Sequence, residues 1–538
     1  MSRMVVIGMD GATWRVLEPL IDAGALPTLN RLRTEGAAGP LRSTVPPLTP
    51  PGWTSAVTGK NPGKHGIFDF RHYSPDDYEV HLTSRLDRHA RAVWNMLGDA
   101  GRRVLVMNVP HTVPPEKVNG VLVTGFGTPG EDVDYTWPPE LKQQILAAEP
   151  GFKVDLPATS IQRGDWDGFL AQLQAHTETQ WRVFTRLYEQ ERPDFAMFVF
   201  AEMDRLMHFF WHYVDATHPA HIPSAYGDAF RSHFAHVDAL LGAFLEKFPG
   251  DTNMLLFSDH GFGPVHSDIY LNNWLRDEGY LVTREASTTT VHPTRVVRVK
   301  AAIVKLLEQL GVWKYYRDYR LRGREVRTVW YLRDVDWSQT RAAVHSMSSH
   351  GIRFNIRGRE RCGVVAPEDA RSLADELSAK LLALCAPDGT RLFRKACYRD
   401  EVFHGPYAAK ASDLLLEPAP GFAIQHGFGD ALIMPSEQHG HLRSGDHEPD
   451  GIVLLHGPHI AHTVLQDAAI VDIAPTLLHL MGEPVRSGMD GKVLQGALRE
   501  TGEVRFVDET DDESIAGGEQ RERDDDALAQ RLRDLGYL

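Results

Sequence analysis

Apolar positions along the chain fall into short runs separated by longer amphipathic stretches. The short runs are rich in β-branched and aromatic residues and predict buried strands at 5–9, 104–107, 121–123, 195–201, 254–257 and 452–455. Between them, apolar residues recur at helical spacing, most clearly over 166–191, which ends just before Pro193. This alternation predicts an α/β fold with a mostly parallel central sheet flanked by helices.

The alternation of predicted strands and helices stops after the strand that ends near Ser258. Residues 351–421 have the pattern of a compact α+β unit with a helix over 367–385, and the strand pattern resumes only at 452. We therefore expect a catalytic core formed by 1–264 and 441–500, with 265–440 inserted as a cap. The last part, 501–538, has the composition of an acidic linker followed by a short docking helix.

Composition narrows the class of protein. The 538 residues carry a formal net charge of −15 with 42% hydrophobic residues, which favours a folded protein and argues against stable nucleic-acid binding. Three cysteines, Cys362, Cys385 and Cys397, form neither a disulfide framework nor a metal knuckle. The apolar run at the N-terminus is interrupted by Asp10, and no run is long enough to span a membrane. We expect a cytoplasmic protein; the sequence does not predict its oligomeric state.

One segment departs from the acidic average. Residues 295–327 contain ten Lys/Arg against three acidic residues, a local balance of +7, interleaved with Trp313 and three tyrosines. Such a segment can form the solvated basic face of a cap helix, attract anionic substrates, or contact a membrane or an RNA. We favour the cap helix over membrane contact.

Two polar residues, Asp10 and Thr49, lie at the ends of predicted elements, where their side chains could take part in a reaction or bind a ligand. Asp10 ends the first predicted strand, at the sheet edge where open α/β folds bind ligands. Thr49 precedes Pro50-Pro51-Gly52 and a short helical run, which places its hydroxyl near a helix N-terminus that can hold an anion. Taken alone, Asp10 can be a loop or capping aspartate and Thr49 an N-cap.

Three further clusters contain metal-ligand residue types. Asp204 and His208 are four residues apart, on one face of a helix that follows the strand at 195–201; His212 on the same stripe is a structural candidate. Asp259-His260 closes the strand at 254–257, and Gly445-Asp446-His447 precedes the strand at 452. Parallel strands would bring such strand-end clusters to one edge, and mixed carboxylate and imidazole ligands suit zinc, with manganese or iron also compatible.

Taken in order, these motifs resemble the alkaline phosphatase superfamily, and within it the type I phosphodiesterase/nucleotide pyrophosphatase family. The resemblance extends from residue 10 to residue 447 and rests on Asp10, Thr49-x9-Gly59 with Pro62-x-x-His65-Gly66-Ile67, Asp204-x3-His208, Asp259-His260-Gly261 and Gly445-x-His447. It implies an alkaline-phosphatase-like central sheet with a variable cap.

The resemblance also implies a chemistry. Two divalent metal ions, most plausibly zinc with manganese as an alternative, would bind at two groups of residues, with the Thr49 oxygen as a further ligand of the second. These groups are Asp204, His208 and His447 for one ion, and Asp10, Asp259 and His260 for the other. Thr49 would be the nucleophile that forms a phosphothreonine intermediate, and the substrate would be an anionic phosphate ester, with a diester favoured.

One position departs from the family pattern. Relatives that cleave nucleotides carry an asparagine five residues after the histidine of the His-Gly-Ile motif, where this chain has Phe70. In this chain the contact that the asparagine makes with a phosphoryl oxygen could be made instead by the Thr49 backbone N–H, Lys60, Lys64 or Asn108. The departure weakens the case for a nucleotide substrate.

Several alternatives remain open at this point. The same site could serve a phosphomutase or phosphotransferase, which returns the phosphoryl group to another hydroxyl, or a phosphate-monoester phosphatase. A sulfatase is disfavoured because Thr49-Pro50-Pro51-Gly52 lacks the Cys/Ser-x-Pro-x-Arg context of that class. A non-catalytic protein that binds a membrane or an RNA through 295–327 is the remaining alternative.

Overall fold

The computed structural model describes residues 3–78, 80–156, 159–247, 252–284, 334–346, 350–438, 440–500 and 502–508. Its main element in these residues is a ten-stranded sheet with the order β21-β2-β20-β9-β1-β8-β5-β6-β7, in which β22 also pairs with β2. The strands are β1 (Arg3–Met9), β2 (Ala37–Arg42), β5 (Val104–Val109), β6 (Gly120–Thr124), β7 (Thr136–Trp137), β8 (Phe195–Phe200), β9 (Thr252–Phe257), β20 (Asp450–His456), β21 (Thr463–Val464) and β22 (Ala468–Ala469).

The centre of this sheet is parallel. Strand β1 pairs in parallel with β8 on one side and with β9 on the other, and β5 pairs in parallel with both β8 and β6. Strand β20 runs antiparallel to β9, and β2 runs antiparallel to β20. The prediction of an α/β fold around a mostly parallel sheet is confirmed. The antiparallel direction of β20 could not be predicted from its apolar run, because such a run does not encode strand direction.

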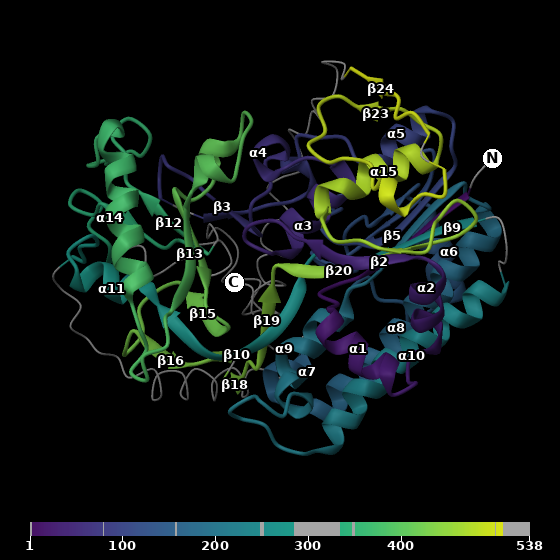
Figure 1. The fold of residues 1–538 in the computed structure, drawn as a ribbon, viewed down its shortest axis with the longest axis horizontal. Helices are drawn as coiled ribbons and strands as arrows, with labels where there is room; N and C mark the ends of the chain where they lie inside the picture. The colour runs from purple at the N-terminus through teal and green to yellow at the C-terminus, as the bar shows by residue number, and fades with distance from the viewer. Residues whose placement is uncertain are drawn as a thin grey trace.

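Helices cover both faces of the sheet (Figure 1). Alternate residues of each strand point to opposite faces, so that Val5 and Ile7 belong to one apolar core and Met4 and Val6 to the other. The first core is closed by α1 (Trp14–Asp22), α2 (Pro27–Glu35), α8 (Trp166–Glu191), α9 (Glu202–Val214) and α10 (Ala225–Lys247). The second is closed by α3 (Thr49–Thr58), α5 (Val93–Asp99) and α15 (Ile473–Leu480).

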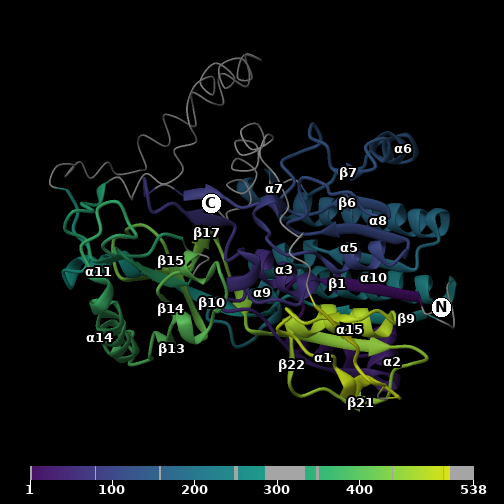
Figure 2. The same cartoon turned by 90° about the horizontal axis from the view of Figure 1, so that it is seen from above.

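A second unit lies beside the sheet, and Figures 1 and 2 show it on the side away from α2 and α15. It contains α11 (Leu271–Asp277), α14 (Ala370–Ala383) and the four-stranded sheet β11-β12-β14-β13, formed by β11 (Ala342–Ala343), β12 (Gly351–Phe354), β14 (Leu414–Pro418) and β13 (Phe393–Tyr398). It has its own apolar core, to which Tyr78 and Val80 from the N-terminal part also contribute. We refer to this unit as the cap.

One long strand joins the two units. Strand β10 (Gly261–Tyr270) begins directly after the Asp259-His260 pair, bonds first to β19 (Gly445–Glu448), and then runs on between β15 (Gly421–Gln425) and β16 (Ile433–Pro435). Figure 1 shows it curving from the large sheet into the cap. The remaining short elements are α4 (Pro62–His65), α6 (Leu141–Ala148), α7 (Thr159–Arg163), β3 (Arg71–Tyr73), β4 (Val80–Leu82), β17 (Glu437–Gln438), β18 (His441–Leu442), β23 (Val485–Arg486) and β24 (Phe506–Val507).

Two predictions lie outside the described residues. These are the basic segment 295–327 and the C-terminal docking helix within 501–538, of which only 502–508 are described. Among the helices that the structure does describe, none combines the length and apolarity needed to cross a membrane.

Candidate metal centre

Three neighbouring parallel strands bring the predicted ligands together. Asp10 follows β1 in the middle, Asp259 and His260 follow β9 on one side, and α9 begins after β8 on the other side and carries Asp204 and His208. Because parallel strands end at the same edge, ligands that are about 250 residues apart in sequence become neighbours. All five side chains are buried, with 0–6% exposure.

His447 reaches the same edge by a different route. It lies on β19, opposite Phe262 of β10, just before β20. Since β20 is antiparallel to β9, the start of β20 lies at the edge where β9 ends. The His447 ring stacks on the His260 ring with 3.8 Å between centroids, and its Nε2 lies 3.0 Å from Asp204 Oδ1.

Each of the three histidines is oriented by a backbone carbonyl. His208 Nδ1 lies 2.8 Å from the Gly445 oxygen, His260 Nδ1 lies 3.0 Å from the Gly261 oxygen, and His447 Nδ1 lies 3.1 Å from the oxygen of Pro47. A carbonyl only accepts hydrogen bonds, so Nδ1 must carry the proton and the neutral ring presents the Nε2 lone pair to the site. This arrangement is typical of metal-ligating histidines.

The facing nitrogens require a positive charge between them. His208 Nε2 and His447 Nε2 are 3.2 Å apart, and with both Nδ1 atoms protonated they present two lone pairs to each other. Without a metal the charge is a proton: burial lowers the pKa of His447, but Asp204 outweighs this and raises it. For Asp204 burial raises the pKa, and the nearby His208 and His447 outweigh it and lower it. A divalent cation at this point satisfies the same requirement.

The two remaining carboxylates also lack a counter-charge. Within the described chain, Asp10 Oδ1 and Asp259 Oδ2 are buried without a hydrogen-bond partner, at 3.6 and 3.2 Å from His260 Nε2. Burial, together with the charges of Asp259 and Asp204, raises the pKa of Asp10 well above its usual value, and burial raises the pKa of Asp259 to about 7. Two buried acids that face one imidazole are chemically suited to hold a cation.

Ligand atoms converge in three overlapping groups in the described part of the chain: Asp204, His260 and His447; His208, Asp446 and His447; and Asp10, Asp259 and His260. Within each group the ligand atoms lie within 4.8 Å of one another. Six of the seven residues are those expected from the sequence. The donor set therefore fits divalent metal ions, and His260 and His447 lie where the groups meet.

Thr49 lies at the edge of this cluster. It is the first residue of α3, and its Oγ1 is 3.3 Å from His260 Nε2. Pro50 and Pro51 have no amide hydrogen and the Gly52 N–H bonds to the Leu48 carbonyl, which leaves the N–H of Thr49 as the first-turn donor. Gly52 permits the approach, because a Cβ there would come within 3.1 Å of the Asp259 Cβ. The Thr49 hydroxyl thus contacts a candidate metal ligand, at a helix N-terminus whose first-turn donor is the N–H of the same residue.

The three residues expected to contact substrate are Lys60, Lys64 and Asn108, and each has different surroundings. Lys60 lies beyond the C-terminal end of α3, about 15 Å along the helix axis from Thr49. Lys64 forms an ion pair with Asp490 and bonds to the Gly488 carbonyl. Asn108 ends β5 near the correct edge, with one amide hydrogen bonded to the Val199 oxygen at 2.7 Å. Among Thr49, Lys60, Lys64 and Asn108, Thr49 is the residue that contacts the ligand cluster, so its N–H is the candidate donor to a phosphoryl oxygen.

Two residues at the site were not predicted from the sequence. Trp53 donates from Nε1 to Asp10 Oδ2 at 3.1 Å. Asp446 joins the ligand group of His208 and His447, but its Oδ2 also accepts from Arg443 at 3.0 Å. The sequence signals were weak: Trp53 follows Thr49 by one helical turn, and Asp446 directly precedes His447. Phe70, at the family's asparagine position, is buried and packs against Phe126.

Comparison with known proteins agrees with this geometry. The model of the type I phosphodiesterase / nucleotide pyrophosphatase family matches residues 4–450. The chain belongs to this family. The match includes every candidate ligand and Thr49, and membership makes the protein a phosphoric ester hydrolase of the alkaline phosphatase superfamily. A comparison with curated proteins finds no match.

Solved structures support the fold. A crystal structure of phosphonoacetate hydrolase from Sinorhizobium meliloti 1021, in complex with phosphonoformate, has a TM-score of 0.50 and 15% sequence identity, and the alignment covers 89% of this chain and 95% of that one. At this identity the likeness concerns the architecture, an alkaline-phosphatase-like sheet with flanking helices.

Proposed function

We propose that this member of the family hydrolyses phosphodiesters through a phosphothreonine formed on Thr49, with two divalent ions, zinc by preference, held by the seven predicted ligands. The observation that carries the proposal is the convergence of three histidine Nε2 atoms, each fixed by a carbonyl at Nδ1, on three aspartates beside the Thr49 hydroxyl. When bound, such ions activate hydroxyl nucleophiles and neutralise phosphoryl oxygens.

Two groups of side chains would hold the two ions. Asp10, Asp259 and His260 form the group next to Thr49, and Asp204, His208 and His447, whose ligand atoms lie 3.0–3.5 Å apart, form the other group. The Thr49 N–H is oriented to donate to a non-bridging phosphoryl oxygen, as backbone donors do at helix N-termini. It takes over the contact that Phe70 cannot make.

The proposed reaction has two steps. Thr49 Oγ1 attacks phosphorus and loses its proton, the bond to the leaving alcohol breaks, and the alcohol takes up a proton. Water then attacks the phosphothreonine and restores the threonine, so that the net reaction consumes one water and releases an alcohol and a phosphate monoester. In-line attack places the leaving oxygen opposite Thr49, on the side of His447.

We also propose that the protein works in the cytoplasm. The cysteines at 362, 385 and 397 are unbridged, which is consistent with the reducing cytoplasm.

The test is turnover of matched 4-nitrophenyl mono- and diesters by metal-stripped protein reconstituted with zinc or manganese, with metal content measured in parallel. We expect two ions per chain and faster turnover of the diester. Phosphoryl transfer to an added alcohol without hydrolysis would identify a phosphotransferase instead. Absence of turnover of any ester by protein that contains two ions would contradict the proposal.

A further inference from the structure

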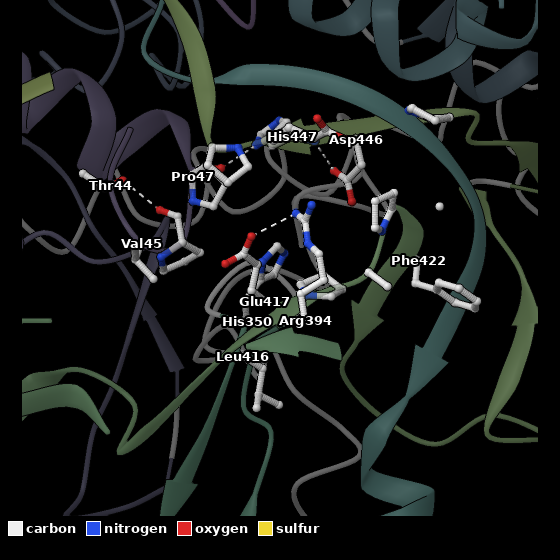
Figure 3. A pocket seen from close by; sticks show the side chains of 18 of the residues that line it. Thr44, Val45, Pro47, His350, Arg394, Leu416, Glu417, Phe422, Asp446 and His447 are labelled. Carbon is white, nitrogen blue, oxygen red and sulfur yellow. Dashed lines mark hydrogen bonds and ion pairs between the residues drawn. The ribbon is translucent and has the colours of Figure 1, made fainter. Parts of the chain in front are cut away.

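A pocket opens beside His447, between the loop that leads into α3 and the turn that connects β14 to β15 in the cap (Figure 3). Val45, Pro46 and Pro47 form one wall, and the turn Pro418–Phe422 faces them from the cap. The Pro47 carbonyl in this wall accepts the hydrogen bond that orients His447. The pocket therefore adjoins the candidate metal centre at His447 and Asp446.

The pocket lies on the side of the candidate metal centre where His447 is found. His447 and Asp446 line it, whereas Thr49, Asp10, Asp259 and His260 do not. Thr49 Oγ1 lies 3.3 Å from His260 Nε2, whereas His447 belongs to the other proposed ligand group, with its Nε2 at 3.0 Å from Asp204 Oδ1 and 3.2 Å from His208 Nε2. Since the leaving group departs opposite the nucleophile, a pocket at His447 is placed to receive the leaving alcohol.

The walls of the pocket are mostly apolar. Five prolines line it in addition to Pro47, together with Val45, Leu416 and the ring of Phe422. Proline rings are rigid, so this surface does not need to be ordered when a ligand binds. An apolar group placed here would leave water without requiring new polar partners.

The charged residues of the pocket are already paired. Arg394 of β13 bonds to Glu417 of the neighbouring strand β14 at 2.9 Å, in the view of Figure 3, and Asp446 bonds to Arg443 at 3.0 Å. The other two charged lining residues, Arg42 and Glu448, pair at 3.2 Å with Asp450 and Arg15. The described lining thus offers no unpaired charge to a charged alcohol group.

We propose that this pocket binds the leaving alcohol and selects an uncharged, largely apolar one. The inference rests on the proposed function, because it assigns a substrate class to that site. The Arg394–Glu417 pair is the point at which selectivity can be changed. Removing the acid frees a cation, and removing the cation frees an acid, so the two substitutions have opposite effects on a charged alcohol.

The test compares two methyl phosphodiesters whose leaving alcohols are matched in size, 4-hydroxybenzamide and 4-hydroxybenzoate. We expect wild-type protein to have the higher kcat/KM for the neutral amide. Glu417→Gln should shift the ratio of kcat/KM values about fivefold toward the carboxylate, and Arg394→Met should shift it away, as expected for a half-exposed charge. The matched controls are Glu401→Gln and Arg371→Met, a cap ion pair of 2.8 Å outside the pocket, which should leave the ratio unchanged.

A binding measurement separates the two proposals. Saturation-transfer NMR should detect 4-hydroxybenzamide on the protein and weaker binding of 4-hydroxybenzoate, with the preference reduced in Glu417→Gln. If the esters are hydrolysed but neither ratio moves in the pocket variants, the pocket assignment is overturned and the proposed function stands. If no ester is hydrolysed but the alcohols bind with this charge preference, the pocket assignment stands and the phosphodiesterase proposal falls.

Discussion

The indole N–H of Trp53 donates a 3.1 Å hydrogen bond to Asp10 Oδ2 and so connects α3, which begins at Thr49, to the end of β1. Trp53 is fully buried, and its ring lies over Gly8, where a Cβ would overlap the indole. One oxygen of Asp10 is thereby fixed, and the other, Oδ1, points toward His260. The position of α3 and the orientation of the candidate ligand Asp10 are therefore set by the same side chain.

Replacing Trp53 by phenylalanine should weaken metal binding. The substitution keeps an aromatic side chain in the core but removes the donor to Asp10, and loss of such outer contacts typically costs about tenfold in affinity. Competition with a chromogenic chelator measures the change. Trp94→Phe is the control, because the Trp94 indole donates to Glu116 at 2.9 Å, away from the ligand cluster. Equal affinities for both variants would contradict the role of Trp53.

Thr49→Ala should abolish turnover while metal content stays near that of wild type. The substitution removes the nucleophilic hydroxyl but none of the aspartates or histidines, so we expect kcat to fall by at least about a thousandfold. Thr58→Ala is a suitable control on the same helix, since the Thr58 hydroxyl bonds to the Thr54 carbonyl within α3. A Thr49→Ala protein with wild-type activity would exclude Thr49 as the nucleophile.

Asp259 should make the metal-free protein less stable as pH rises. Burial raises the pKa of Asp259 from 3.8 to about 7, so its protonated form stabilises the fold fully below about pH 4, and this contribution is lost as pH rises through about 7. Metal binding replaces the proton and should remove the dependence. Thermal unfolding at pH 5 and pH 8, with and without zinc, measures the effect. Without metal, the melting temperature of wild type should fall relative to that of Asp259→Asn on going from pH 5 to pH 8; an unchanged difference between the two proteins would contradict the role of Asp259.

Asp490→Asn should destabilise the fold at neutral pH. Burial alone would raise the pKa of Asp490, but hydrogen bonds from Lys64, Asn61 and His404 outweigh it and lower the pKa from 3.8 to about 2. The resulting stabilisation is present above about pH 4 and is lost as pH falls through about 2.

Because Asp490 is largely buried but its partner Lys64 is partly exposed, with side-chain exposures of 15% and 27%, solvent screens part of the interaction, and we expect a loss of about 1–2 kcal/mol in the free energy of unfolding at pH 7. Urea unfolding measures this loss, and the difference from wild type should shrink near pH 2. Asp375→Asn, in an exposed pair with Arg371, should change stability by less than about 0.5 kcal/mol. Equal losses in the two variants would contradict the account.

The sequence by itself determined the local elements and much of the candidate site. Strand runs such as 195–201 and the helix 166–191 are visible because burial on one or two faces imposes a period on neighbouring residues. Asp10, Asp259 and the Asp204/His208 pair could be placed at one edge because the ends of parallel strands coincide. The family resemblance supplied the role of Thr49.

Only the tertiary structure decided how His447, Trp53 and the cap meet this edge. His447 arrives there because β20 runs antiparallel to β9 and β19 pairs with β10, and a local apolar pattern carries no information on strand direction. The bonds of Trp53 to Asp10 and of His447 to Pro47 join residues 43 and 400 positions apart. Such contacts are set by how the layers pack, which is also why Lys64 is engaged by Asp490 rather than by the site.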